Sequence, residues 1–116
     1  MLLISAEAID RKLHDADIDL GTLTSDSDGV RFSGILFDVV KVGKRSTPAK
    51  FRYRALLQGA SGFEVEDPDC LQHLSVCGVS HQDARLVIAS CAVGQLTILC
   101  PRPVLLVEQE STPCAT

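Results

Sequence analysis

Four side chains of the types that zinc prefers lie within twelve residues of the sequence: Cys70, His73, Cys77 and His81. Cysteine thiolates and imidazole nitrogens are the usual ligands of structural zinc. The order and gaps of these four match no common zinc pattern. If the segment is a strand, its last three candidates share one face but span roughly 26 Å, since a strand rises about 3.3 Å per residue. Only a looped segment would bring the four to one ion, so we expect no metal or other cofactor.

A second candidate is a basic stretch in which no acid occurs between Val39 and Phe63. Its six cations are candidate contacts for a nucleic acid or another anion: Lys41, Lys44, Arg45, Lys50, Arg52 and Arg54. A basic strand with aromatic residues can bind single strands by stacking and phosphate contact. Here Phe51 and Tyr53 alternate with the cations, and alternation places them on the opposite face of a strand. The chain has only five aromatic residues in total, which is poor material for stacking.

The neighbouring sequence predicts where these charges find partners. A hairpin turning near 59–61 would pair Arg54 with Glu64 or Glu66 and would place Arg52 beside Glu66. Opposite charges across a strand pair contribute roughly 0.2–1 kcal/mol, and exposed pairs lie at the low end. This pairing would partly neutralise the strand. The cations left free would be Lys41, Lys44 and Arg45.

Apolar residues are concentrated in the last third of the chain, where the segment Leu86 to Pro101 contains no charge. The run is interrupted and shorter than the roughly 20 apolar residues of a membrane span, so it predicts a buried core. Cys91 and Cys100 lie inside it and are therefore expected to be buried. Residues 84–93 fit a helical stripe or a buried strand. A strand is favoured because the opposite helical face would be barely polar.

The remaining elements follow from local patterns. Ser5 can cap a short helix with apolar residues at 6, 9, 13 and 16. Strands are expected at 30–42, 50–57, 63–66, 74–79, 96–100 and 104–108, with a loop at 43–48. Gly34 inside the first of these strands marks a bulge or a close backbone approach. The fold predicted is mainly β with a short N-terminal helix, an antiparallel partly open barrel or sandwich; the alternative is α+β with a helix at about 81–93.

Length and composition limit the possible functions. The 116 residues predict one globular domain, 1–110, followed by a flexible polar tail, 111–116. A folded chain of 12.5 kDa should expose roughly 6,200 Å². The net charge of −4 argues against a dedicated duplex-DNA binder. The N-terminus does not resemble a secretory signal, and the five cysteines form no Cys-x-x-Cys, so reduced thiols in a cytoplasm are expected.

Without a recognisable nucleophile, ligand set or phosphate loop, a small binding or regulatory module is favoured over an enzyme. Its partner is expected to be another protein, because a small β domain offers strand edges to which a partner can add. We expect no membrane partner. Two alternatives stay open. One is a single-stranded nucleic-acid-binding domain that uses the strand Lys50 to Arg54, and the other is an enzyme whose site assembles from distant residues.

Overall fold

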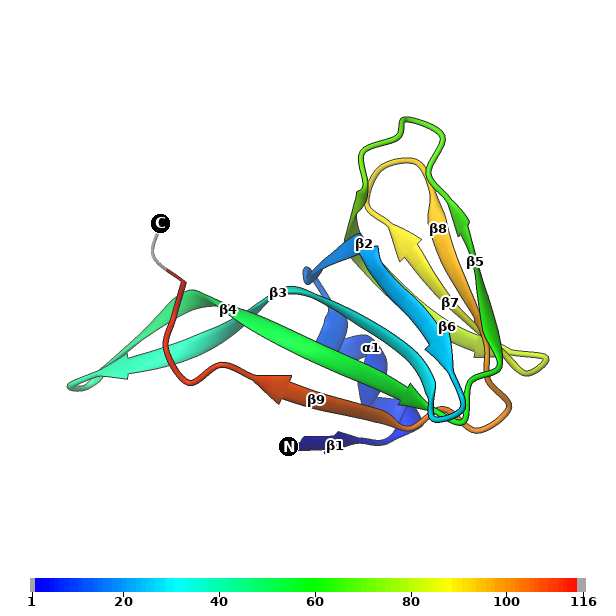
Figure 1. Ribbon diagram of the computed structural model, residues 1–116. Helices are drawn as coiled ribbons and strands as arrows, with labels where there is room; N and C mark the ends of the chain where they lie inside the picture. Colours follow the sequence, from blue (N-terminus) through cyan, green and yellow to red (C-terminus); the bar gives the residue numbers. More distant parts are fainter. Residues whose placement is uncertain (1, 115–116) are drawn as a thin grey trace.

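The computed structural model describes residues 2–114, which form one helix and nine strands (Figure 1). The elements in chain order are β1 (Leu2–Ile4), α1 (Ala6–Leu13), β2 (Asp17–Asp26), β3 (Gly29–Val42), β4 (Arg45–Gln58), β5 (Gly62–Glu66), β6 (His73–Gln82), β7 (Arg85–Ser90), β8 (Gln95–Leu99) and β9 (Leu105–Gln109). The mainly β fold with a short N-terminal helix is confirmed. Within residues 2–114, no helix is long enough and apolar enough to cross a membrane.

The strands form a single antiparallel sheet in the order β1-β9-β4-β3-β2-β6-β7-β8-β5. The sheet does not close on itself, so β1 and β5 are its edges. It bends between β3 and β2, and Figure 1 shows β9, β4 and β3 in one part and β6, β7, β8 and β5 in the other. This arrangement agrees with the predicted open barrel or sandwich.

The core follows the alternation read from the sequence. Phe51 and Tyr53 of β4 are buried, and the cations between them are exposed. Tyr53 packs edge-on against Phe32 of β3, with 6.3 Å between the ring centroids. The helix contributes Ile9 and Leu13, which are both fully buried. One apolar stripe on α1 therefore covers the sheet, as its spacing of four residues predicts.

Within the segment 84–93, Arg85–Ser90 form strand β7, and the alternative helix at 81–93 is wrong. Leu86 and Ile88 are buried at a spacing of two residues, and β7 pairs with β6 on one side and β8 on the other. Two strand neighbours satisfy its backbone, which no helix in this position could match. The predicted burial of Cys91 is also wrong, because Cys91 follows β7 in an exposed turn. Cys100 is buried as predicted.

Gly34 is a place of close backbone approach, as expected. A Cβ atom there would lie 1.9 Å from the carbonyl oxygen of Asp17 on β2. The chain therefore uses glycine where β2 and β3 come too close for any side chain. Strand β3 runs unbroken through this point over 14 residues.

Two predicted connections are wrong. The expected loop at 43–48 is a turn of two residues, Gly43 and Lys44, because Arg45 already belongs to β4 and pairs with Val42. Gly43 has a φ of 65°, which suits the first position of a tight hairpin turn. The expected hairpin between 50–57 and 63–66 does not form, since β5 pairs with β8 and β4 pairs with β3 and β9.

Candidate functional site

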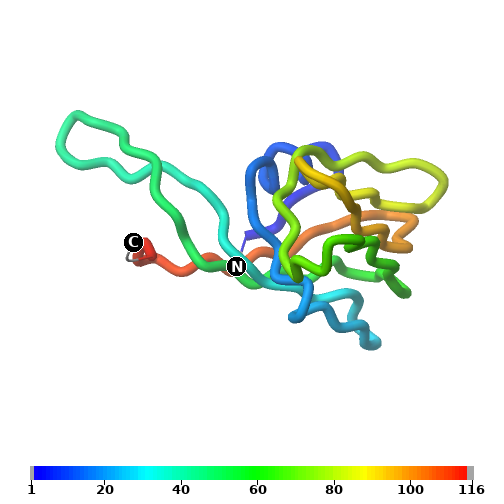
Figure 2. Tube along the Cα trace, turned by 90° about the horizontal axis from the view of Figure 1, so that it is seen from above, coloured from blue at the N-terminus to red at the C-terminus, as the bar shows by residue number. Residues whose placement is uncertain are grey.

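The β3–β4 hairpin extends beyond the rest of the sheet as a two-stranded ribbon. We call residues 37–50 the arm. Figure 1 and Figure 2 both show it projecting away from the other strands. Within residues 2–114, β2 pairs with β3 only as far as Ile35, and β9 pairs with β4 only from Tyr53 onward. At the base of the arm, the backbone N–H of Cys114 donates to the carbonyl of Lys50 at 2.7 Å. Within residues 2–114, most of the arm therefore has no third strand at either edge, and most of its side chains are exposed.

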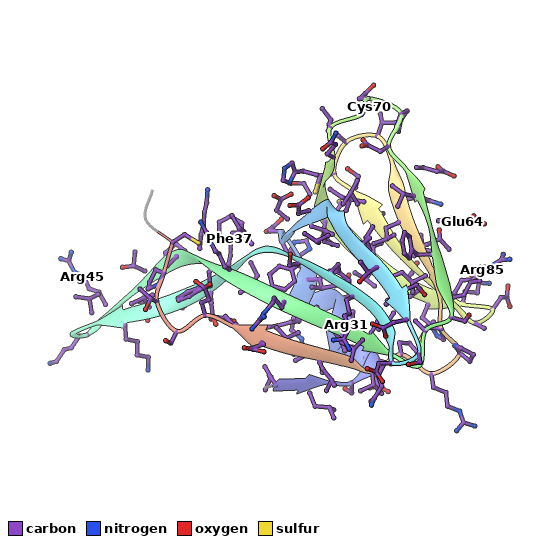
Figure 3. The ribbon with its side chains drawn as sticks, viewed as in Figure 1. Arg31, Phe37, Arg45, Glu64, Cys70 and Arg85 are labelled. Carbon is purple, nitrogen blue, oxygen red and sulfur yellow. The ribbon has the colours of Figure 1, made fainter. Side chains whose placement is uncertain are left out.

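The arm exposes large apolar side chains. Phe37 is 48% exposed and Val39 is 56% exposed, and both lie on the same face of β3. Pro48 faces Val39 across the ribbon. Val42, 67% exposed, lies on the opposite face near the tip. Figure 3 shows Phe37 near the base of the arm and Arg45 near its end. The face that carries Phe37 and Val39 also carries Lys50 at its base and Lys41 towards the tip.

The cations of the arm have no acidic partner in the part of the chain from 2 to 114. Lys41, Lys44, Arg45 and Lys50 form no ion pair there. The ammonium of Lys50 lies 5.8 Å from the centre of the Phe37 ring, within the range of a cation–π interaction.

The single acid of the arm is Asp38. Hydrogen bonds from the N–H of Val39 and the amide of Gln109, 3.2 Å away, lower the pKa of its carboxyl. Its carboxylate is thus held at the base of the arm. With four cations and one acid, the arm is a basic segment of an acidic chain.

The other two predicted cations lie outside the arm. Arg54 donates to the Glu108 carboxylate at 2.7 Å, so its predicted pairing with Glu64 or Glu66 is wrong. The reason is strand order, since β9 lies beside β4 where β5 was expected. Arg52 also has no Glu66 beside it, because β5 lies at the far edge of the sheet.

Arg52 and Arg54 line an open groove of about 430 Å³ on the outer face of the sheet. The groove also collects a histidine and four acids from β2, β6 and the end of β9: His73, Asp17, Asp19, Glu108 and Glu110. His73 Nδ1 lies 3.3 Å from the Asp17 carboxylate. Tyr53 donates a hydrogen bond to the Asp17 carbonyl at 3.3 Å; burial and the Asp17 carboxylate raise the pKa of Tyr53.

The groove has a possible base but no nucleophile beside it. The hydroxyl candidate on its wall is Ser33, which pairs with Asp19, and Asp19 in turn pairs with His73. Ser33 and His73 are thus two strand spacings apart, roughly 9.6 Å. A nucleophile and its base must lie within hydrogen-bond reach, and the His73 ring contacts the Asp17 carboxylate and not Ser33. The mixed charges of the groove mainly pair with one another.

The four candidate zinc ligands do not converge. Three lie along extended β6, and Cys70 lies in the loop that Figure 3 shows at the far end of β5. His73 contacts Asp17, and His81 Nε2 lies 2.8 Å from the carbonyl oxygen of Cys100. Within residues 2–114, no group of three or more His, Cys, Asp and Glu side chains is placed to hold a metal ion.

Comparisons of the chain with models of protein families, with curated proteins and with solved structures find no match. The residues that sequence reasoning overlooked are Phe37, Val39 and Val42. They belong to the β-branched and aromatic run 30–42, which was predicted only as a strand. The available signal was the interval from 41 to 50, where polar and charged residues outnumber apolar ones. A strand pair whose turn is flanked mainly by polar residues has too few apolar side chains there to join a core.

Proposed function

We propose that the chain is a small non-enzymatic protein-binding module and that the arm is its binding element. The observation that carries the proposal is the exposure of Phe37, Val39 and Val42 on a ribbon to which no third strand is paired within residues 2–114. An isolated two-stranded ribbon is marginally stable in water. Contiguous exposed apolar residues are typical of protein interaction sites. A partner that covers the arm would supply the packing that the sheet leaves out.

The amount of exposed surface supports this proposal. The accessible surface is 7247 Å². A compact chain of this mass should expose roughly 6,200 Å². The excess is about 1,000 Å², similar to the roughly 800 Å² that each partner contributes to a standard interface. The arm therefore offers enough additional surface for one specific partner.

Charge defines the kind of partner. Lys41, Lys44 and Arg45 lie close together at the tip, beyond the apolar residues. A complementary protein has an apolar pocket bordered by acidic side chains, because complementary charge increases the association rate and fixes orientation. We place this module in the cytoplasm, since all five cysteines are free thiols and thiols persist in reducing compartments.

A single-stranded nucleic acid is the second candidate. The unpaired cations of the arm favour it, because phosphate contacts dominate such binding. The strand Lys50 to Arg54 has fewer side chains available to contact a nucleic acid than its sequence predicts. Phe51 and Tyr53 are buried and cannot stack on bases, and Arg54 is paired with Glu108. The exposed apolar area of the arm favours a protein, since nucleic-acid interfaces are polar.

The test separates the apolar and cationic contributions. The double variant Phe37→Ser with Val39→Ser removes the apolar face, and Val93→Ser is the matched control, since Val93 is exposed in another turn. We expect partners captured from the native host to be retained by the control and reduced at least about tenfold by the double variant. Equal capture by both variants would refute the proposal.

Oligonucleotide binding provides the complementary measurement. For a protein-binding arm, single-stranded oligonucleotides should bind weakly and be released near 150 mM salt, about the physiological ionic strength. Tight binding in that salt, lost when Lys41, Lys44 and Arg45 are changed to Gln, would replace the first proposal with the nucleic-acid one.

A further inference from the structure

Two exposed cysteines, one on β6 and one directly after β7, lie next to each other on the outer face of the sheet. Cys77 belongs to β6, and Cys91 follows the last residue of β7. The backbone N–H of Cys91 donates to the carbonyl of Ser75 at 2.9 Å, so Cys91 extends the pairing of the two strands. Val76, between Ser75 and Cys77, is buried. Alternation therefore directs Ser75, Cys77 and Cys91 to the same, outer face.

An irregularity in the strand pairing brings the two thiols closer than a regular ladder would. Val76 pairs with Ser90, but the next pair is Gly78 with Ala89. Cys77 is the additional residue of this bulge. In a regular antiparallel pair, diagonal neighbours are about 7–8 Å apart, which is long for a disulfide. Because the additional residue disrupts the ladder at Cys77, the regular diagonal spacing does not apply to Cys77 and Cys91. Desolvation and the interaction with the Cys77 thiol raise the pKa of Cys91.

The backbone around the pair is held from the side of the helix. The N–H of Asp15 donates to the carbonyl of Val76 at 3.0 Å, and the N–H of Val76 donates to the carbonyl of Ala16 at 2.8 Å. A ring nitrogen of His14 lies 3.1 Å from the carbonyl oxygen of Cys77. Both cysteines thus project from a segment with a defined position. Preorganisation of this kind favours a bond between the two sulfurs over reaction of either one alone.

We propose that Cys77 and Cys91 are a reversible redox pair that forms an intramolecular disulfide by exchange with a low-molecular-weight disulfide. The thiolate of one cysteine attacks a sulfur of the small disulfide, forming a mixed disulfide and releasing one small thiolate. The second cysteine, as its thiolate, attacks the protein sulfur of that mixed disulfide and releases the other. The protein loses two protons and two electrons, and the small disulfide gains them to become two thiols.

Two of the other cysteines are poorly placed to compete, because Cys100 is buried and Cys114 lies at the base of the arm. Cys70 lies in the β5–β6 loop, at the same end of β6 as Cys91, and is the competitor for which the test must control. The new bond would close the hairpin from Cys77 to Cys91 and would hold the bulge in place. The consequence is a chain that is harder to unfold in an oxidising environment than in a reducing one.

The test equilibrates the protein with mixtures of reduced and oxidised glutathione, then quenches it by alkylation and identifies linked peptides by mass spectrometry. The measurement is repeated in urea, where the chain is unfolded. We expect the effective concentration of the Cys77–Cys91 pair to be at least about tenfold higher in the native protein. By linkage, the same factor must appear as an increase in the folding equilibrium constant of the oxidised protein over the reduced protein.

Two variants complete the design. Cys70→Ser should leave the formation of the Cys77–Cys91 disulfide unchanged. Cys91→Ser should keep the mixed glutathione disulfide on Cys77, because no second thiol remains to resolve it. A native effective concentration equal to or below the urea value would overturn the proposal. Linkage of Cys70 to either member, or stable mixed disulfides at both positions in the unmodified sequence, would overturn it as well.

Discussion

Replacing Gly34 with alanine tests how closely β2 and β3 must approach. The new Cβ would lie 1.9 Å from the carbonyl oxygen of Asp17 and 3.1 Å from the Cα of Ile18. Both neighbours are backbone atoms, so no flexible side chain can move aside. The strands must separate by about 1.5 Å to reach an ordinary contact of 3.4 Å. A ladder hydrogen bond does not survive that displacement.

The expected loss in the free energy of unfolding follows from the interactions that separating β2 from β3 would break. Gly34 pairs with Ile18, and the flanking pairs join Asp17 to Ile35 and Asp19 to Ser33. Losing two or three ladder bonds costs about 0.5–1.5 kcal/mol each, and shifting the fully buried Ile18 costs about 1–3 kcal/mol more. We expect Gly34→Ala to lower the free energy of unfolding by about 4 kcal/mol, a large part of the stability of a small domain.

Urea denaturation followed by circular dichroism measures this loss. The matched control is Gly62→Ala, because a Cβ at Gly62 meets nothing within 4 Å. The control should leave the free energy of unfolding unchanged or raise it by up to about 1 kcal/mol. A loss below about 1 kcal/mol for Gly34→Ala, or equal effects of the two variants, would show that the strands can separate freely and that the reasoning is wrong.

Three further results are expected. Ile98→Ala should lower the free energy of unfolding by about 2–5 kcal/mol, measured in the same assay, because Ile98 is fully buried. In native thiol labelling, exposed Cys70 should react quickly; Cys100 should react only after unfolding, because burial shields it and raises its pKa. Arg31→Gln should return the pKa of Asp26 towards 3.8 in an NMR titration, since the Arg31 hydrogen bond lowers it. The stability that this carboxylate contributes is present above 3.8 and is lost as pH falls through the lower folded-state value. Arg31→Gln should weaken that dependence without removing it, because the backbone N–H of Asp28 still donates to Asp26.

Much of the fold was predictable because periodicity is a local property. The alternation from Lys50 to Leu57 identified a strand and its buried face, and the apolar stripe after Ser5 identified the helix. The uncharged run from Leu86 to Pro101 was rightly assigned to the core, although the turn containing Cys91 leaves it. Its ambiguity between helix and strand was resolved by β6 and β8, which pair with both sides of β7.

The sequence predicted which residues could act in a site, but not which of them lie close together. The cations of 41–54 were identified from the sequence, but the pairing of Arg54 with Glu108 depends on β9 lying beside β4. The proximity of Cys77 to Cys91 likewise depends on one bulge. No local pattern shows either fact.

By itself, the sequence determined which residues face inward, where one helix and most strands lie, and that the chain has one apolar core. Only the tertiary structure decided which strands become neighbours, that Phe37, Val39 and Val42 remain exposed, and which charges and thiols meet. The physical reason is that side-chain direction repeats every two residues along a strand, whereas strand order is set by how the whole sheet buries its apolar face.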